Sequence, residues 1–366
     1  MVAIVIITAL IALAFSFTNG MNDAANCIAT VVKTKALPPK VAVGWAAFWI
    51  FAAQWIFPMT VAATMGKGIV AQDCIDVYVI LAALLGSVLW IFACTMFGLP
   101  VSASHALVGG LIGPVWFVYG SRFLVASGIL KTVAFIVISP LLGCLMGFTF
   151  NCLFMWIFRH RNVKKVDTGF RRMQLLSSAA FSLGFGGNDG QKTLGVIAIL
   201  FATAFATQPD SGLMLTLFGR GAVEAGVYST SGQLLVDGGF YVPLWLRYTC
   251  YGLIAIGSIT GGWKVIRTLG DGLTPRINPT QGFCAEASGA ITLILTAVLG
   301  VPVSTTHTIT GSIIGTGLTR GFKRVKWMTA KRIVWAWVLT IPAVIIVSGL
   351  IYLLMTGVLG CPVKAL

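Results

Sequence analysis

Two Asn-Asp pairs in apolar surroundings are the first residues of this sequence that could do chemistry. One pair lies in Gly20-Met21-Asn22-Asp23-Ala24-Ala25-Asn26, directly after the apolar run from Met1 to Phe17. The other lies in Gly186-Gly187-Asn188-Asp189-Gly190-Gln191-Lys192. A carboxylate at the depth of a lipid bilayer costs several kcal/mol unless a cation or proton compensates it, so such residues are usually functional. Two of these pairs in one chain predict one site that is built twice.

The oxygens of these pairs suit Na⁺ or a proton better than they suit an anion. Glu286 also lies in an apolar stretch and is predicted to be a third cation ligand or a proton carrier. A purely structural role for the aspartates is the less common alternative. The residues predicted to bind the cation or proton are Asn22, Asp23, Asn188, Asp189 and Glu286.

Two hydroxyl-rich breaks in other apolar stretches could bind an anion. Residues 98–105 contain Pro100, Ser102, Ser104 and His105, and residues 300–307 contain the related run Pro302, Ser304, Thr305, Thr306 and His307. Proline followed by serine is typical of a helix N-terminus. Helices that begin within the membrane would direct free N–H groups and the positive end of the dipole at a tetrahedral oxyanion.

The residues predicted to bind the anion combine hydroxyl, amide and ammonium donors. They are Asn22, Asn26, Ser102, Ser104, Gln191, Lys192, Ser304, Thr305 and Thr306. The alternatives are that the hydroxyls cap helices or pack as small residues, and that Lys192 is only a structural partner of Asp189. His105 and His307 could titrate, but packing beside the breaks is the more common role for such residues.

Charge favours a transporter that moves the anion together with cations. Two like charges about 5 Å apart repel by about 3 kcal/mol at an effective dielectric constant of 20. Two aspartates and an oxyanion would therefore repel strongly unless Na⁺ or protons lie between them. An anion channel would not need the paired aspartates.

Composition identifies a membrane protein. Of 366 residues, 57% are hydrophobic and 10% are charged, and the mean hydropathy is +0.93. Soluble domains carry about 25% charged residues. Continuous apolar runs of about 20 residues predict membrane-spanning helices rather than a barrel of alternating strands. We expect the apolar N-terminal run to be retained as the first span, which we predict to be interrupted at Asn19-Gly20.

The net charge of +15 sets the topology and does not indicate nucleic-acid binding. Most basic residues lie in four short segments, 33–40, 159–172, 264–276 and 320–332. Short basic segments between spans mark the cytoplasmic side. The N- and C-termini are accordingly predicted to lie outside the cell, in a chain that resides in the plasma membrane. No cofactor other than coupling Na⁺ or H⁺ is expected.

An internal repeat organises the chain. Residues Pro100, Val101, Ser102 and His105 recur 202 positions later, and Asn22-Asp23 recurs 166 positions later. We predict a first repeat at 1–158 (signature 19–27, tip 98–105), a basic linker at 159–172, and a second repeat at 173–366 (signature 186–193, tip 300–307). Each break is interpreted as the tip of a re-entrant helical hairpin. We therefore predict an all-α protein. Its two halves would have opposite orientations in the membrane and form two inverted-topology repeats, as in many secondary transporters.

The four motifs together resemble the inorganic phosphate transporter family, often called PiT. Its repeats each carry a Gly-x-Asn-Asp signature and a Pro-Val-Ser-like hairpin tip, and the resemblance covers nearly the full length. It implies cation-coupled phosphate uptake and a fold with transport and scaffold parts, often as a homodimer. It leaves Na⁺ and H⁺ open as the coupling ion.

The sequence therefore predicts a secondary active transporter that imports phosphate with Na⁺ or H⁺ by alternating access. The main alternative is a sulfate or other oxyanion permease of the same fold, followed by an anion channel. An enzyme is not expected, because no nucleophile lies beside a base in the sequence. Residues 208–239 contain no motif that we can interpret.

Overall fold

The structure is a computed structural model that describes residues 2–62, 69–71, 74–208, 211–229, 241–270, 272–274, 277–301, 303–358 and 360–361. Within these ranges the regular secondary structure is helical, apart from isolated bridge residues such as the pair Val70 and Leu124. This confirms the prediction of an all-α protein.

The first half of the chain contributes α1 (Val2–Lys33), α2 (Pro39–Ile56), α4 (Val77–Met96), α5 (Ala103–Tyr119), the short η2 (Ser121–Phe123) and α6 (Ala126–Ile157). The middle contributes α7 (Val163–Phe185), the π-helical turn η3 (Gly186–Gly190), α8 (Gln191–Thr207), α9 (Gly212–Met214), η4 (Leu215–Gly219) and α10 (Arg220–Glu224). The remaining helices are α11 (Leu244–Thr260), α12 (Trp263–Gly270), α13 (Pro279–Val298), α14 (Thr305–Leu318), η5 (Phe322–Arg324) and α15 (Trp327–Gly357).

Six helical segments among the described residues are long and apolar enough to cross a membrane. They are α1, α4, α6, the continuous stretch Val163–Thr207, α13 and α15, whereas α5 is a shorter apolar helix. Many of their large apolar side chains face outward, as expected of helices that are solvated by lipid. The chain is an integral membrane protein.

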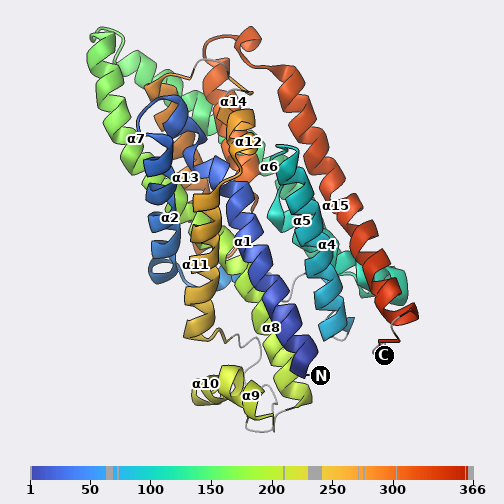
Figure 1. Ribbon diagram of the computed structural model, residues 1–366. Helices are drawn as coiled ribbons and strands as arrows, with labels where there is room; N and C mark the ends of the chain where they lie inside the picture. The colour runs from blue at the N-terminus through green and yellow to red at the C-terminus, as the bar shows by residue number, and fades with distance from the viewer. Residues whose placement is uncertain are drawn as a thin grey trace.

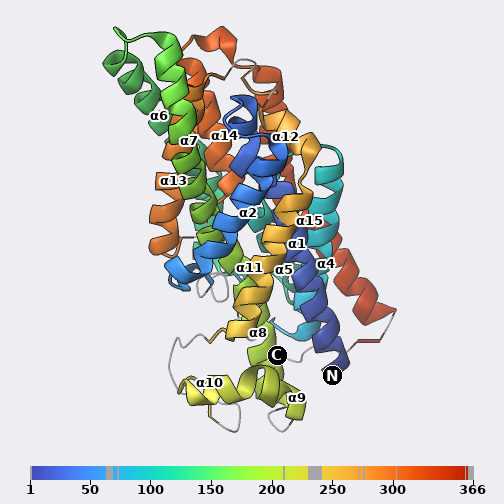
Figure 2. The same cartoon turned by 60° about the vertical axis from the view of Figure 1, so that its left-hand side comes forward.

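The two ends of the chain lie at the same end of the bundle (Figures 1 and 2). The turn between α6 and α7 and the loop between α14 and α15 lie at the opposite end. Two of the four basic segments begin in these connections and continue into α7 and α15. The arrangement agrees with termini on one side and basic segments on the other, and the assignment of each side to the cell exterior or interior stays a prediction.

Both predicted breaks are tips of helical hairpins. The backbone bond from Val125 N to Ile69 O (3.0 Å) joins the chain before α4 to the chain after α5. In the same way, Lys326 N donates to Leu273 O (2.9 Å), which joins the chain before α13 to the chain after α14. Each helix pair therefore returns to the end of the bundle from which it started. Pro302, expected at the second tip, lies outside the described residues.

Two local predictions were wrong. The motif Asn19-Gly20 was expected at an interruption of the first span, but α1 continues through it as one helix. A Cβ atom at Gly20 would lie 2.2 Å from Ile254 O, so this glycine permits close packing against α11 and does not break the helix. The basic linker 159–172 was expected to be a loop, but α7 begins at Val163, where Asn162 caps it by accepting from Lys164 N.

The segment without a motif is partly helical. Within residues 208–239, the structure describes α9, η4 and α10, whereas residues 209–210 and 230–239 lie outside the described part.

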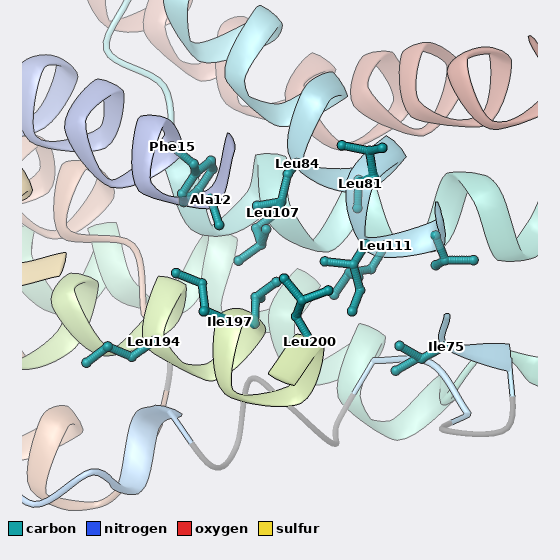
Figure 3. Close-up of a cluster of buried hydrophobic side chains, with 14 of the residues drawn as sticks. Ala12, Phe15, Ile75, Leu81, Leu84, Leu107, Leu111, Leu194, Ile197 and Leu200 are labelled. Carbon is teal, nitrogen blue, oxygen red and sulfur yellow. The ribbon is translucent and has the colours of Figure 1, made fainter. Parts of the chain in front are cut away.

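Apolar side chains from distant segments pack around the middle of the bundle. Figure 3 shows Phe15 of α1, Leu84 of α4, Leu107 of α5 and Ile197 of α8 directed toward one another. All four side chains are buried or nearly so. A second buried cluster surrounds the C-terminal half of α1 and includes Phe181 and Leu293. The polar residues of the two signatures lie between these clusters on α1 and on the η3–α8 segment.

Each hairpin packs against the last long helix of the other half. A Cβ atom at Gly109 of α5 would lie 2.7 Å from Ile341 O of α15, and one at Gly311 of α14 would lie 2.0 Å from Pro140 O of α6. Gly109 and Gly311 are related by the repeat offset of 202. Small residues allow such close approach between helices in a membrane, where apolar burial alone does not drive association.

We predict that Gly311→Ala separates α14 from α6 and lowers the free energy of unfolding by about 1–3 kcal/mol, as overpacking does in other helix contacts. The matched control is Gly44→Ala in α2, where an added Cβ atom would meet nothing within 4 Å. Thermal unfolding of the purified variants in detergent measures both effects. Equal melting temperatures for the two variants would contradict the packing role of Gly311.

Candidate functional site

The first signature forms a buried hydrogen-bonded group on α1. Asp23 Oδ1 accepts from Asn22 Nδ2 (3.0 Å) and from Asn26 Nδ2 (2.9 Å). Asn22 Nδ2 also donates to Val101 O at the first hairpin tip (2.9 Å). Since Asn22, Asp23 and Asn26 are each at most 1% exposed, the carboxylate is removed from solvent and fixed by neutral donors.

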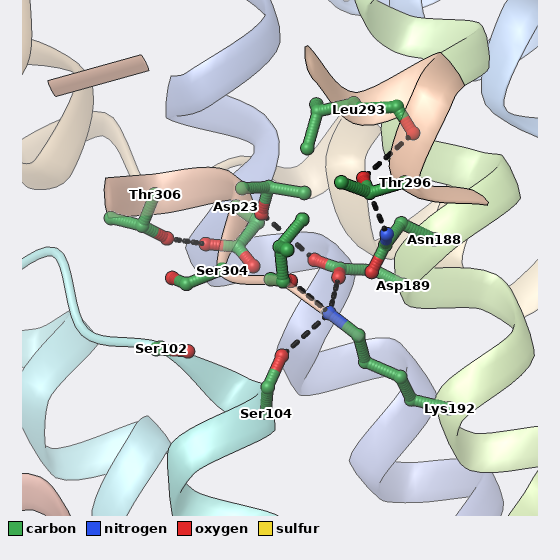
Figure 4. Close-up of polar contacts among 12 residues, drawn as sticks. Asp23, Ser102, Ser104, Asn188, Asp189, Lys192, Leu293, Thr296, Ser304 and Thr306 are labelled. Carbon is green, nitrogen blue, oxygen red and sulfur yellow. Dashed lines mark hydrogen bonds and ion pairs between the residues drawn. The ribbon is translucent and has the colours of Figure 1, made fainter. Parts of the chain in front are cut away.

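The second signature places its carboxylate beside a lysine. Gly186–Gly190 forms a π-helical turn, after which α8 begins and directs Lys192 back toward Asp189. The Lys192 ammonium forms an ion pair with Asp189 Oδ1. It also donates to Ser104 Oγ (2.5 Å) and to Val303 O (2.6 Å), and Figure 4 shows Ser104 and Asp189 both directed at this amine.

The second hairpin tip joins the two signatures. Thr305 Oγ1 donates to Asp189 Oδ2 (2.9 Å), and Thr306 Oγ1 donates to Asp23 Oδ1 (2.9 Å). Because these two threonines are consecutive in the chain, the two aspartates must lie beside the same turn of α14. The two signatures, 166 positions apart, therefore belong to one site.

Both tips end in capped helix N-termini. Ser102 Oγ accepts from His105 N (3.4 Å), and Ser304 Oγ accepts from His307 N (3.3 Å). A serine at this position satisfies one of the N–H groups that a helix start leaves open. The N-termini of α5 and α14 therefore lie next to the signature residues, where their dipoles favour an anion.

The two aspartates of the site differ in their charged partners. Asp189 has a lysine as its direct partner, whereas Asp23 is bound by neutral amides and a hydroxyl and lies against the carboxyl group of Asp189. An opposite charge about 4 Å away contributes about 4 kcal/mol at an effective dielectric constant of 20. Asp23 has no direct ion pair among the described residues and is attracted by Lys192 only as a neighbour of the Asp189 pair.

Three buried amide oxygens of the signatures are available as further ligands. Asn19 Oδ1, Asn26 Oδ1 and Asn188 Oδ1 have no hydrogen-bond partner among the described residues. Buried polar atoms nearly always find a partner. A cation is a suitable partner for an amide oxygen that lies beside a carboxylate.

Asn188 is positioned by its own amide. Its Nδ2 donates to Thr296 Oγ1 (3.4 Å) and to Val301 O at the second tip (3.3 Å). The equivalent residue Asn22 accepts from Thr95 Oγ1 (3.0 Å). Sequence reasoning missed Thr95 and Thr296, although both are polar residues that shortly precede a tip within an apolar helix, and this pattern could have identified them.

Gln191 does not join the other predicted phosphate ligands. Its Oε1 accepts from Val61 N (3.0 Å) and Ala62 N (3.2 Å), and its Nε2 donates to Pro58 O (2.8 Å). The side chain therefore binds the backbone that follows α2 and has a structural role there.

Glu286 lies in a separate buried polar group. It accepts from Gln174 Nε2 (3.1 Å) and from the hydroxyls of Thr30 and Ser177. Thr30 is two helical turns beyond Asn22 and Asp23 on α1. The structure thus places Glu286 outside the group formed by the two aspartates.

The two histidines pack against each other behind the tips. The ring centroids of His105 and His307 are 4.7 Å apart, and the His307 ring stacks on Trp337 at 3.8 Å. Both are buried, which agrees with the packing role considered from the sequence.

Comparisons with known proteins identify relatives over almost the whole chain. The family model described as "Phosphate transporter family" matches residues 19–166 and 158–348. The chain is 43% identical to a protein of Rhizobium meliloti (strain 1021) named "probable low-affinity inorganic phosphate transporter", over 93% of each chain. It is 33% identical to a protein of the same name from Bacillus subtilis (strain 168), over 96% of each chain.

A solved structure titled "The sodium-dependent phosphate transporter" has a similar fold, with a TM-score of 0.82 and 25% sequence identity. The alignment covers 97% of this chain and 100% of that chain. These relatives are transporters, which confirms the prediction that the protein is a transporter and not an enzyme. The family model covers most of the chain, including both signatures and both hairpin tips. The chain therefore belongs to the phosphate transporter family.

Proposed function

We propose that this protein imports inorganic phosphate across the plasma membrane by symport with Na⁺ and alternating access. The observation that carries the proposal is that Thr305 and Thr306 bind one aspartate each, from opposite halves of the chain. A helix N-terminus suited to an anion thereby lies beside two carboxylates that require cations.

Phosphate would bind between the N-termini of α5 and α14. The proposed ligands are Asn22, Asn26, Ser102, Ser104, Ser304, Thr305 and Thr306, together with backbone N–H groups at the two tips. Thr305 and Thr306 now donate to the aspartates. When a cation neutralises a carboxylate, these hydroxyls can donate to phosphate instead, so cation and phosphate binding support each other.

The cation would bind at carboxylate and amide oxygens of the signatures. Asp23 and the unpartnered Asn26 Oδ1 are the best supported ligands, with Asn188 Oδ1 close to the second tip. Glu286 with Thr30 and Ser177 would form a separate cation or proton site. We favour Na⁺ because the solved relative is titled a sodium-dependent transporter.

Alternating access would use the two repeats, 1–158 and 173–366, as inverted copies. The packing of α5 on α15 and of α14 on α6 supports this, since residues related by one offset make corresponding contacts. Movement of the hairpins against their neighbours would expose the midplane site to one side at a time. The extracellular placement of the termini and a homodimeric state are parts of the same proposal.

Purified protein in proteoliposomes should accumulate labelled phosphate when an inward Na⁺ gradient is imposed. Asp23→Asn should reduce uptake by at least about tenfold, equivalent to about 1.4 kcal/mol, because it removes the charge that binds the cation. The control is Asp167→Asn, a partly exposed carboxylate on α7 outside the site.

Three results would contradict the proposal. Uptake that follows a proton gradient and ignores Na⁺ would refute sodium coupling. Full competition by sulfate at equal concentration would refute phosphate selectivity. Uptake that is unchanged in Asp23→Asn would refute the site.

Gln191→Leu and Thr306→Val should separate a structural residue from a ligand. Gln191→Leu removes three hydrogen bonds to residues 58–62 and should lower the free energy of unfolding by about 1–3 kcal/mol while the KM for phosphate changes less than about twofold. Thr306→Val keeps the shape of the side chain and should raise the KM. Uptake kinetics and thermal unfolding of both variants distinguish the two roles. A raised KM with normal stability in Gln191→Leu would show that Gln191 is a phosphate ligand.

A further inference from the structure

Lys192 and Asn26 occupy equivalent positions in the two halves. Asn26 corresponds to Lys192 at the signature offset of 166, and Ser104 corresponds to Thr306 at the tip offset of 202. The contacts correspond as well: Asn26 Nδ2 donates to Thr306 Oγ1 (3.0 Å), and Lys192 Nζ donates to Ser104 Oγ (2.5 Å). Each of the two residues also binds the aspartate three positions before it.

The two positions differ in charge. Asn26 supplies Asp23 with a hydrogen bond but no positive charge, whereas Lys192 supplies Asp189 with both. Lys192 is 1% exposed, so water cannot compensate its ammonium and the nearby carboxylate must do so.

The surroundings of the Lys192 ammonium resemble those of a bound cation. Its nitrogen contacts a carboxylate oxygen of Asp189, a hydroxyl oxygen of Ser104 and the carbonyl oxygen of Val303. An ammonium group has three N–H donors, and these three oxygens use all of them. No donor of Lys192 remains for phosphate in this arrangement.

We propose that Lys192 is a built-in counter-ion that takes the place of a coupling cation at Asp189. The mobile Na⁺ of the paired-aspartate site then binds at Asp23, with Asn26 Oδ1 as a further ligand. If neither aspartate had a fixed partner, each phosphate would need one more mobile cation. Lys192 thus determines the number of Na⁺ ions that are transported with each phosphate. This inference rests on the proposed symport and makes its stoichiometry specific.

Equilibrium binding of radioactive ²²Na⁺ to the purified protein tests the assignment directly. Asp23→Asn should reduce the number of Na⁺ bound per chain by one. The double variant Asp189→Asn/Lys192→Gln removes both members of the ion pair, so that no unpaired charge is left buried, and should bind as many Na⁺ as the unmodified protein. Loss of one Na⁺ in the double variant, with no loss in Asp23→Asn, would overturn the inference.

Exchanging the equivalent residues gives a second test that does not depend on transport. Lys192→Asn makes the two halves alike and should add one Na⁺ per chain, with a larger rise in melting temperature on addition of Na⁺. Asn26→Lys supplies Asp23 with a fixed charge and should remove one Na⁺. The control is Lys164→Asn, an exposed lysine on α7.

The outcomes distinguish this inference from the proposed function. A folded Lys192→Asn protein that binds no additional Na⁺ overturns the inference even if phosphate uptake is normal. The same result combined with a raised KM for phosphate would assign Lys192 to the substrate instead. Absence of phosphate uptake by the unmodified protein would refute the proposed function, while the Na⁺ counts would still report on Lys192.

Discussion

The structure depends on the burial of two neighbouring carboxyl groups inside a membrane bundle, with Lys192 paired to one of them. Asp189 is neutralised by Lys192, while Asp23 is held by amides and a hydroxyl. A carboxylate that is removed from water without a direct counter-charge is costly, which is why we propose a mobile cation at Asp23. In the proposed mechanism an anion enters the same space only when that cation is present. The proposed coupling between cation and phosphate would then follow from electrostatics before any conformational change is considered.

The remaining architecture serves to bring polar groups to this depth without exposing backbone to lipid. Helices α5 and α14 begin inside the bundle, where Ser102 and Ser304 cap their N-termini and the neighbouring N–H groups stay available. Irregular backbone at membrane depth is tolerated only where protein or a polar cavity surrounds it. Glycines on α5 and α14 let these helices pack closely on α15 and α6, which holds each tip against the opposite half of the chain.

Much of this could be predicted because the signals are local. Asn22-Asp23, Asn188-Asp189 and the two tips are unusual residue types in apolar sequence, and the recurrence of the signature after 166 positions and of the tip after 202 indicates a duplication. The errors arose where tertiary contacts decide. Gly20 was interpreted as a helix break, but its contact with Ile254 shows a packing role. Gln191 was interpreted as a ligand, but its partners lie about 130 residues earlier in the chain, at Val61 and Ala62. The partners of Glu286 come from α1 and α7, a combination that no sequence pattern indicates.

An experimental structure of the protein in lipid, determined with phosphate and Na⁺ at saturating concentration, tests the central claim most directly. The account predicts density for a tetrahedral anion between the N-termini of α5 and α14, within hydrogen-bonding distance of Thr305 and Thr306. It also predicts an ion at Asp23 and Asn26, with the Lys192 ammonium still paired to Asp189. An anion bound to the Lys192 ammonium, with the ion at Asp189 instead of Asp23, would contradict the account.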